Sequence, residues 1–110
     1  MTLLRFLPRL KRRKFFLVRQ IMGDSMAPTL RPGVIVFGVR PSRLRPGDVV
    51  IIRHDNLDKV KRIREVQNGK LFLTGDNYLH STDSHEFGWL DIQAVLAKVV
   101  WPKLKAPPAE

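Results

Sequence analysis

The chain has 110 residues, which is enough for one domain with a single modest core. A hydrophobic fraction of 44% beside 27% charged residues indicates a globular protein and excludes a disordered one. The sequence contains no cysteine, which excludes a disulfide framework, a thiolate metal site and cysteine catalysis. The absence of cysteine suits a reducing compartment, and we expect a cytoplasmic protein.

The net charge of +10 is concentrated near the N-terminus, where residues 1–20 contain seven basic residues and no acidic one. Such a block binds nucleic acid, lies on anionic lipid or remains a solvated tail. We expect an arm over residues 1–20 that is solvated or in peripheral contact with an anionic membrane, without a nucleic-acid partner. No apolar run approaches the ~20 residues of a membrane helix. The charges follow the first leucines, unlike those of a secretory signal.

Strand signals begin at residue 33. The β-branched runs 33–39 and 48–52 each begin at or just after a Pro-Gly turn and look like buried strands. Residues 59–67 and 70–74 flank Asn68-Gly69, a strong hairpin signal because both positions tolerate the positive φ of a type I′ turn. The pattern therefore predicts a mainly β protein.

The end of the chain is less regular. Residues 91–101 fit either a short helix or a final strand, and Val99-Val100-Trp101 favours a strand closed by Pro102. The tail 103–110 is rich in proline and alanine and is expected to be loose. We predict three parts: the arm 1–20, a domain 21–102 and the tail 103–110.

A candidate nucleophile lies in the turn-rich segment Gly23-Asp24-Ser25-Met26-Ala27-Pro28-Thr29-Leu30. A serine hydroxyl is a weak nucleophile until a neighbouring group accepts its proton. Lys61, in the apolar run Val60-Lys61-Arg62-Ile63, is a candidate base. Taken alone, Ser-Met-x-Pro is usually a turn or helix cap, and Lys-Arg in a strand is usually a solvated edge.

Two further blocks change that interpretation. Gly47-Asp48-Val49-Val50 precedes the lysine, and Gly75-Asp76-Asn77 is followed by a polar run that ends at Gly88. In this order, the four blocks resemble the signal peptidase I family of serine-lysine proteases over about residues 21–101. The resemblance implies antiparallel sheets in a small single peptidase domain, and serine endopeptidase activity without a cofactor. Gly47-Asp48 and Gly75-Asp76 are interpreted as structural turns.

The resemblance assigns catalytic roles to Ser25 and Lys61. Ser25 attacks a peptide carbonyl, and Lys61 as a neutral amine accepts its proton. A lysine with its reference pKa of about 10.4 is almost fully charged at neutral pH, so burial must lower that pKa. The backbone N–H of Ser25 forms part of the oxyanion hole, Gly23 allows close approach of the substrate, and Met26 lines the pocket. Lys59 remains open as a competing base.

The resemblance also implies a supporting group of residues. Ser81 orients the lysine amine, and Asp83 holds the site through an arginine two positions later. Here that position is His85. Because histidine titrates near pH 6.5, we expect His85 to donate to Asp83 and activity to decline at higher pH.

Within the family, residues 70–88 are most similar to the nickel-type superoxide dismutase maturation proteases. The implied partner is a precursor protein that carries an N-terminal leader. The sequence departs from that pattern at Tyr78 and at His85. We also expect no transmembrane segment, in contrast to the membrane anchor of typical signal peptidases.

Other readings stay open. His54, His80 and His85 could suggest a metal site, but their spacing is not that of a helical zinc motif. A triad of Ser25, His54 and Asp83 would leave the Lys61 block unexplained. A self-cleaving repressor domain shares the chemistry, but this chain has no Ala-Gly dipeptide to cut. A non-catalytic module with a basic arm for nucleic acid or anionic membrane is the main alternative.

Overall fold

The computed structural model describes residues 15–78 and 89–107. Within these ranges the chain forms seven strands and one short 3₁₀ helix, and it has no α-helix. The elements are β1 (Phe16–Gln20), β2 (Ile35–Val39), β3 (Val49–His54), β4 (Leu57–Gln67), β5 (Lys70–Thr74), β6 (Leu90–Asp91), η1 (Ile92–Ala94) and β7 (Val95–Trp101). All neighbouring strands are antiparallel, which confirms the predicted mainly β class.

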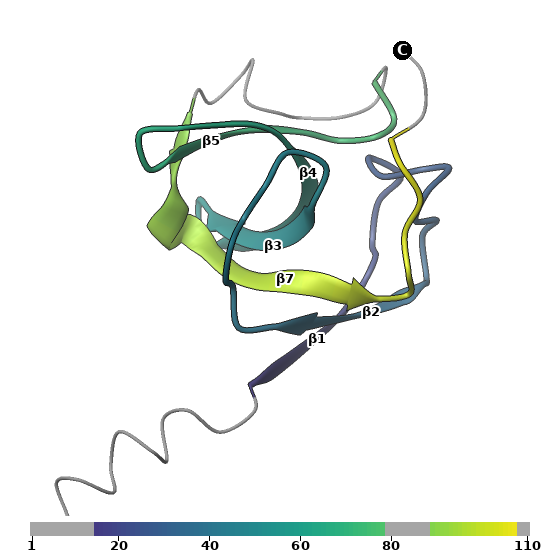
Figure 1. Ribbon diagram of the computed structural model, residues 1–110. Helices are drawn as coiled ribbons and strands as arrows, with labels where there is room; N and C mark the ends of the chain where they lie inside the picture. The colour runs from purple at the N-terminus through teal and green to yellow at the C-terminus, as the bar shows by residue number, and fades with distance from the viewer. Residues whose placement is uncertain (1–14, 79–88, 108–110) are drawn as a thin grey trace, which may run out of the picture.

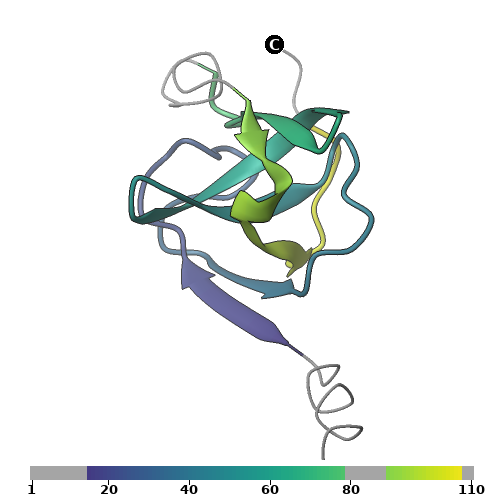
Figure 2. The same cartoon turned by 90° about the vertical axis from the view of Figure 1, so that its left-hand side faces the viewer.

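The strands form one sheet in the order β1-β2-β7-β3-β4-β5-β6. This sheet curls strongly, with β5 and β7 on opposite sides of the view in Figure 1. The turned view in Figure 2 shows β1, in purple, along the lower side of the molecule and away from β5. Strand β1 therefore forms one edge of the sheet, β7 lies inside it between β2 and β3, and the β4–β5 hairpin lies toward the other edge.

Strand β3 is the centre of the packing because its first four residues are buried on both faces of the sheet. Val49 and Ile51 pack into one core cluster, whereas Val50 and Ile52 pack into a second. A continuous apolar run is the pattern expected for a strand covered on both sides. The predicted buried strand at 48–52 is therefore confirmed.

Strand β2 differs from its prediction. Its residues alternate between buried and exposed, so only one face is covered. Val36 and Gly38 point inward, and Ile35 and Phe37 are exposed. The Val-Ile-rich run favoured a strand buried on both sides, but composition cannot distinguish that from a strand with an apolar outer face.

The hairpin at Asn68-Gly69 is confirmed: both residues have positive φ, and β4 pairs with β5 across the turn. The final segment combines the two alternatives, because η1 precedes strand β7. Strand β1 occupies the last five residues of the range assigned to the basic arm, so this part of the arm belongs to the sheet. Among the described residues, we find no helix with the length and apolar character needed to cross a membrane.

Candidate active site

The segment that follows β1 forms a compact turn around Ser25. The backbone N–H of Ala27 donates to the carbonyl of Asp24 at 3.0 Å, and that of Leu30 donates to the carbonyl of Met26 at 2.8 Å. Met26 and Leu30 are almost fully buried in the first core cluster. Ser25 itself is partly exposed. The two apolar anchors therefore hold the turn against the core while the serine faces outward.

Lys61 lies in the middle of β4, opposite Val50 of β3. Only 3% of its surface is exposed, although an ammonium group is among the costliest to bury. The neighbours Arg62 and Ile63 are buried as well, because β4 is covered on both faces at this point. Strand alternation sends consecutive side chains to opposite faces, so Lys61 and Arg62 enter different environments.

Lys61 and Ser25 line the same cleft, of about 330 Å³. Its apolar walls include Ile21, Ile51 and Val60. Residues from the turn after β1 and from β4, distant in sequence, thus meet at one surface. A hydroxyl and a buried amine in one partly apolar cleft are the groups that serine-lysine chemistry requires.

Arg62 forms a buried ion pair on the opposite face of β4. Its Nε donates to Oδ1 of Asp76 at 2.9 Å, and its Nη2 donates to Oδ2 at 2.7 Å. The third donor, Nη1, is 2.7 Å from the carbonyl oxygen of Gly47. This two-pronged arrangement suits a planar guanidinium and a carboxylate. Arg62 therefore links β4 to two of the four blocks recognised in the sequence.

Asp76 and Asn77 form hydrogen bonds with the turn that contains Ser25. The hydroxyl of Thr29 donates to Oδ2 of Asp76. The backbone N–H of Asn77 donates to the carbonyl of Ser25 at 2.9 Å, and Nδ2 of Asn77 donates to the carbonyl of Asp24 at 3.1 Å. A chain of hydrogen bonds thus runs from the strand that carries Lys61 to the turn that carries Ser25.

An ion-pair network centred on Asp58 lies at one side of the cleft. Nε of Arg19 lies 2.8 Å from Oδ2 of Asp58, and Nε of Arg53 lies 2.9 Å from Oδ1. The hydrogen bond from Arg53 is the main reason that the pKa of Asp58 lies below its usual value, and the bond from Arg19 adds to the effect. Arg19 and Asp58 both line the cleft, so this network joins β1 to β4 at the cleft.

Residues 4–100 match the family Peptidase S24-like. The chain belongs to this family. Its members are serine hydrolases that use a Ser-Lys dyad, which agrees with the pair found in the cleft. No curated protein gives a significant match to the chain.

The S24-like domain brings some of the predicted site residues together. Gly23 and Met26 line the cleft with Ser25 and Lys61, and a Cβ placed on Gly23 would meet no atom within 4 Å. Met26 is also part of the core, so it anchors the turn as well as lining the cleft. The three supporting residues, Ser81, Asp83 and His85, lie outside the described residues.

Lys59, the competing base, also lines the cleft, and its Nζ lies 3.3 Å from Nδ1 of His54. His54 lies 3.5 Å from the carboxylate of Asp55 and is not among the described residues that line the cleft. His54 is therefore not placed in the cleft with Ser25, and Asp83, the third member of that triad, lies outside the described residues.

Sequence reasoning gave no role to Asn77, Thr29 or Arg19. Asp76 was interpreted as a turn residue, whereas it is buried and bonded to Arg62 and Thr29. The signal available for Asp76 was an aspartate two positions after an apolar strand, in a chain with an arginine beside the candidate base. No sequence signal identifies Asn77 as a clamp, because its partners are backbone carbonyls.

Proposed function

We propose that this protein is a serine endopeptidase that removes an N-terminal leader from a precursor protein. Ser25 is the nucleophile and Lys61 the general base. The observation that carries the proposal is the shared cleft: a partly exposed serine and a buried lysine line it together, in a chain of the S24-like family.

The proposed reaction begins when the neutral amine of Lys61 takes the proton of Ser25 Oγ, which attacks the peptide carbonyl carbon. Burial supports this role because desolvation disfavours an ammonium relative to an amine. The tetrahedral intermediate collapses as the C–N bond breaks, and Lys61 returns the proton to the leaving amine. A water molecule, deprotonated by Lys61, then hydrolyses the acyl-enzyme ester and frees Ser25.

The oxyanion of the tetrahedral intermediate needs hydrogen-bond donors at the mouth of the cleft. The backbone N–H of Ser25 is one proposed donor. Gly23 offers no side chain there, so the substrate backbone approaches closely. Ser81 is proposed to orient the Lys61 amine, and Asp83 with His85 to support it, as in the signal peptidase I family.

The proposed substrate is the precursor of a nickel-type superoxide dismutase or another protein with a short leader. The resemblance of residues 70–88 to the maturation proteases of that enzyme supports this choice. The apolar walls of the cleft suit small apolar side chains next to the scissile bond. The lack of cysteine in the sequence supports a cytoplasmic location.

The test is cleavage of a leader-bearing precursor, including the apo superoxide dismutase precursor, by wild-type protein and by Ser25→Ala and Lys61→Met. Mass spectrometry of the products identifies the new N-terminus. We expect a single specific cut with wild type and a fall in rate of at least about 10²-fold in both variants. Lys59→Met is the matched control, because Lys59 also lines the cleft, and it should retain cleavage.

Three outcomes would contradict the proposal. A cut that survives in Ser25→Ala and Lys61→Met would exclude the dyad. Loss in Lys59→Met with retention in Lys61→Met would transfer the base to Lys59. No cut of any leader-bearing precursor would favour the non-catalytic module with a basic arm.

A further inference from the structure

Charged side chains line one end of the cleft, and the proposed reaction gives them no role. The charged end of the cleft consists of Arg19 in β1 and of Asp58 and Lys59 in β4. Asp58 precedes Lys61 by three residues in β4, which corresponds to about 10 Å along a strand. An extended peptide that starts at the dyad therefore reaches the ion pair of Arg19 with Asp58 in about three residues.

The charged end has an excess of positive charge. Both carboxylate oxygens of Asp58 are occupied, Oδ2 by Nε of Arg19 at 2.8 Å and Oδ1 by Nε of Arg53 at 2.9 Å. Two guanidinium groups thus share one carboxylate, and Lys59 adds a further basic side chain next to Asp58 in the sequence. Asp58 is therefore engaged within the protein, and the group that approaches this end meets cations.

Arg19 differs from Arg62, whose guanidinium is used entirely inside the fold. Arg62 has a side chain that is 4% exposed, and it donates through Nε, Nη1 and Nη2. The side chain of Arg19 is 36% exposed. It donates through Nε to Asp58 and through Nη1 to the carbonyl of Val18, whereas Nη2 donates to none of the described residues. Arg19 therefore keeps a charged donor for another group, in the wall of the cleft.

We propose that Arg19 binds an acidic side chain of the substrate at the charged end of the cleft. This inference rests on the proposed peptidase function and names the class of substrate that the site prefers. A carboxylate is the natural partner of a guanidinium, because the hydrogen bonds between them are assisted by charge. The acidic residue lies about three positions from the scissile bond, since an extended peptide advances about 3.3 Å per residue.

The part of the cleft next to the nucleophile favours different side chains. Asp24 directly precedes Ser25, lines the cleft and is exposed, so an acidic residue beside the scissile bond would meet a like charge. Ile21 and Ile51 provide apolar wall in the same cleft. The preferred substrate therefore combines small apolar residues at the scissile bond with an acidic residue farther along the peptide.

The experiment uses two sets of fluorescein-labelled peptides with random apolar residues around a central Ala-Ala bond. Peptides within a set differ at one residue, which is Glu, Gln or Lys. This residue stands three positions before the central bond in the first set and three positions after it in the second. Fluorescence anisotropy with the full chain carrying Ser25→Ala measures binding without turnover. In one set, we expect the Glu peptides to bind about fivefold tighter than the Gln peptides and the Lys peptides to bind weakest, with smaller differences at high salt.

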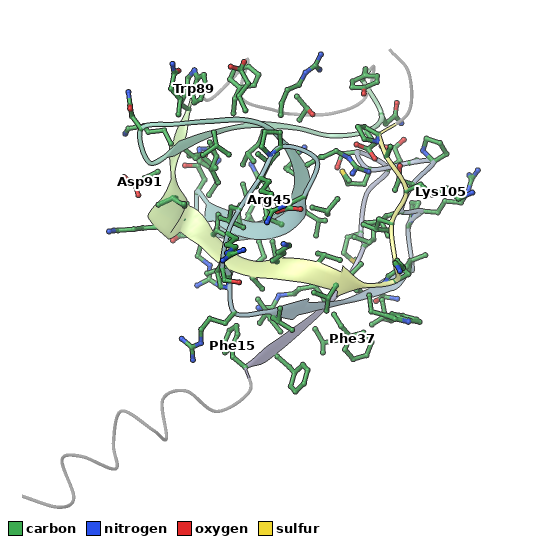
Figure 3. All side chains as sticks on the ribbon, in the orientation of Figure 1. Phe15, Phe37, Arg45, Trp89, Asp91 and Lys105 are labelled. Carbon is green, nitrogen blue, oxygen red and sulfur yellow. The ribbon has the colours of Figure 1, made fainter. Side chains whose placement is uncertain are left out.

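Substitutions assign the preference to Arg19. In Arg19→Gln, the affinities for Glu and Gln peptides should agree within about twofold, and Arg19→Glu should reverse the order of the Glu and Lys peptides. Arg53→Gln is the matched control: it removes the same charge and one bond to Asp58, but Arg53 is not among the described residues that line the cleft. Lys105→Gln controls for net charge, and Figure 3 shows Lys105 pointing outward on the segment after β7. Both controls should keep the preference for Glu.

Several results would overturn the proposal. Equal binding of the Glu and Lys peptides in both sets, or no binding of any peptide, would do so directly. A preference that persists in Arg19→Gln, or that Lys105→Gln removes to the same extent, would assign it to the overall positive charge. The same peptides then serve as substrates for the chain with intact Ser25. Tight binding of Glu peptides through Arg19 without any cut would contradict the peptidase function and leave the charge preference in place. Cleavage of all peptides at equal rates would contradict the charge preference alone.

Discussion

Two adjacent residues of β4, Lys61 and Arg62, are both basic and both buried, yet they serve opposite sides of the molecule. Arg62 is neutralised by Asp76 through two short hydrogen bonds. Lys61 lines the cleft with Ser25. Because side chains alternate along a strand, one short segment can hold the fold on one face and provide a reactive group on the other.

Substitutions on the two faces of β4 should have different effects. Changes on the Arg62 side should lower the free energy of unfolding, since they leave a buried charge without a partner. Changes on the cleft side should lower catalytic rate and leave stability nearly intact.

Arg62→Met should destabilise the protein by about 3–5 kcal/mol, because Asp76 would keep a buried carboxylate without its cation. Lys61→Met replaces a buried amine by an apolar side chain of similar length, so the free energy of unfolding should be unchanged or increased. Urea unfolding followed by circular dichroism measures both. The difference between the two variants is the quantity that tests the comparison.

Arg53→Gln is the control for Arg62→Met. Arg53 also bonds a carboxylate through Nε at 2.9 Å, but its side chain is largely exposed. Its substitution should change stability little. Equal losses for Arg53→Gln and Arg62→Met, or a large loss for Lys61→Met, would show that burial does not separate the two faces.

Asn77→Ala should lower kcat about tenfold to 10²-fold, because displacing a reacting group by about an ångström has effects of that size. The substitution removes the bond from Nδ2 to the Asp24 carbonyl and keeps the backbone bond to Ser25. Stability should fall by only about 1 kcal/mol. Steady-state kinetics on a leader-bearing peptide measures kcat and KM separately.

Asn77→Asp gives the second arm of this test. It keeps the size of the side chain and removes both amide donors, so kcat should fall at least as far as in Asn77→Ala. Unchanged kcat in both variants, or a rise in KM alone, would remove Asn77 from the positioning of Ser25.

Much of the fold was predictable because local signals agreed with the final structure. Asn68-Gly69 predicted the β4–β5 hairpin, and the run at 48–52 predicted the doubly buried β3. The prediction that β2 is buried on both faces was wrong, because a strand with an exposed apolar face has the same composition as a strand covered on both faces. The position of β1 in the sheet was missed because its basic neighbours dominate the charge of that region.

The site was predictable in its residue types and not in its geometry. The face that Lys61 takes could not be read from alternation, because Lys61, Arg62 and Ile63 are all buried where β4 is covered on both sides. A bulge between Ile63 and Glu65 then shifts the register. The clamp formed by Asn77 is a contact between segments far apart in sequence, and it follows from the tertiary fold alone.

Gly23→Ala tests a residue that lines the cleft. An added Cβ would meet no protein atom within 4 Å, and the glycine has no left-handed φ, so the fold should not change. Substrate backbone that approaches Gly23 would meet the methyl group, and kcat/KM should fall about tenfold, which corresponds to about 1.4 kcal/mol. Thermal unfolding serves as the control. A lower melting temperature with unchanged kcat/KM would reverse the assignment of Gly23.

Asp58→Asn should have the smallest effect, because its partners Arg19 and Arg53 are partly or largely exposed. The pKa of Asp58 lies below its usual value in the folded protein, chiefly through the hydrogen bond from Arg53. A lowered carboxyl pKa adds stability above the unfolded-state pKa, and this is lost as pH falls through the folded-state pKa. The small stability difference between wild type and Asp58→Asn should therefore be constant above about pH 5 and disappear in acid. Melting curves from pH 7 to pH 3 measure it, and a difference that grows in acid would show that the carboxylate is not held in its charged form. Since Arg19 belongs to β1, such a result would also weaken the link between that strand and the cleft.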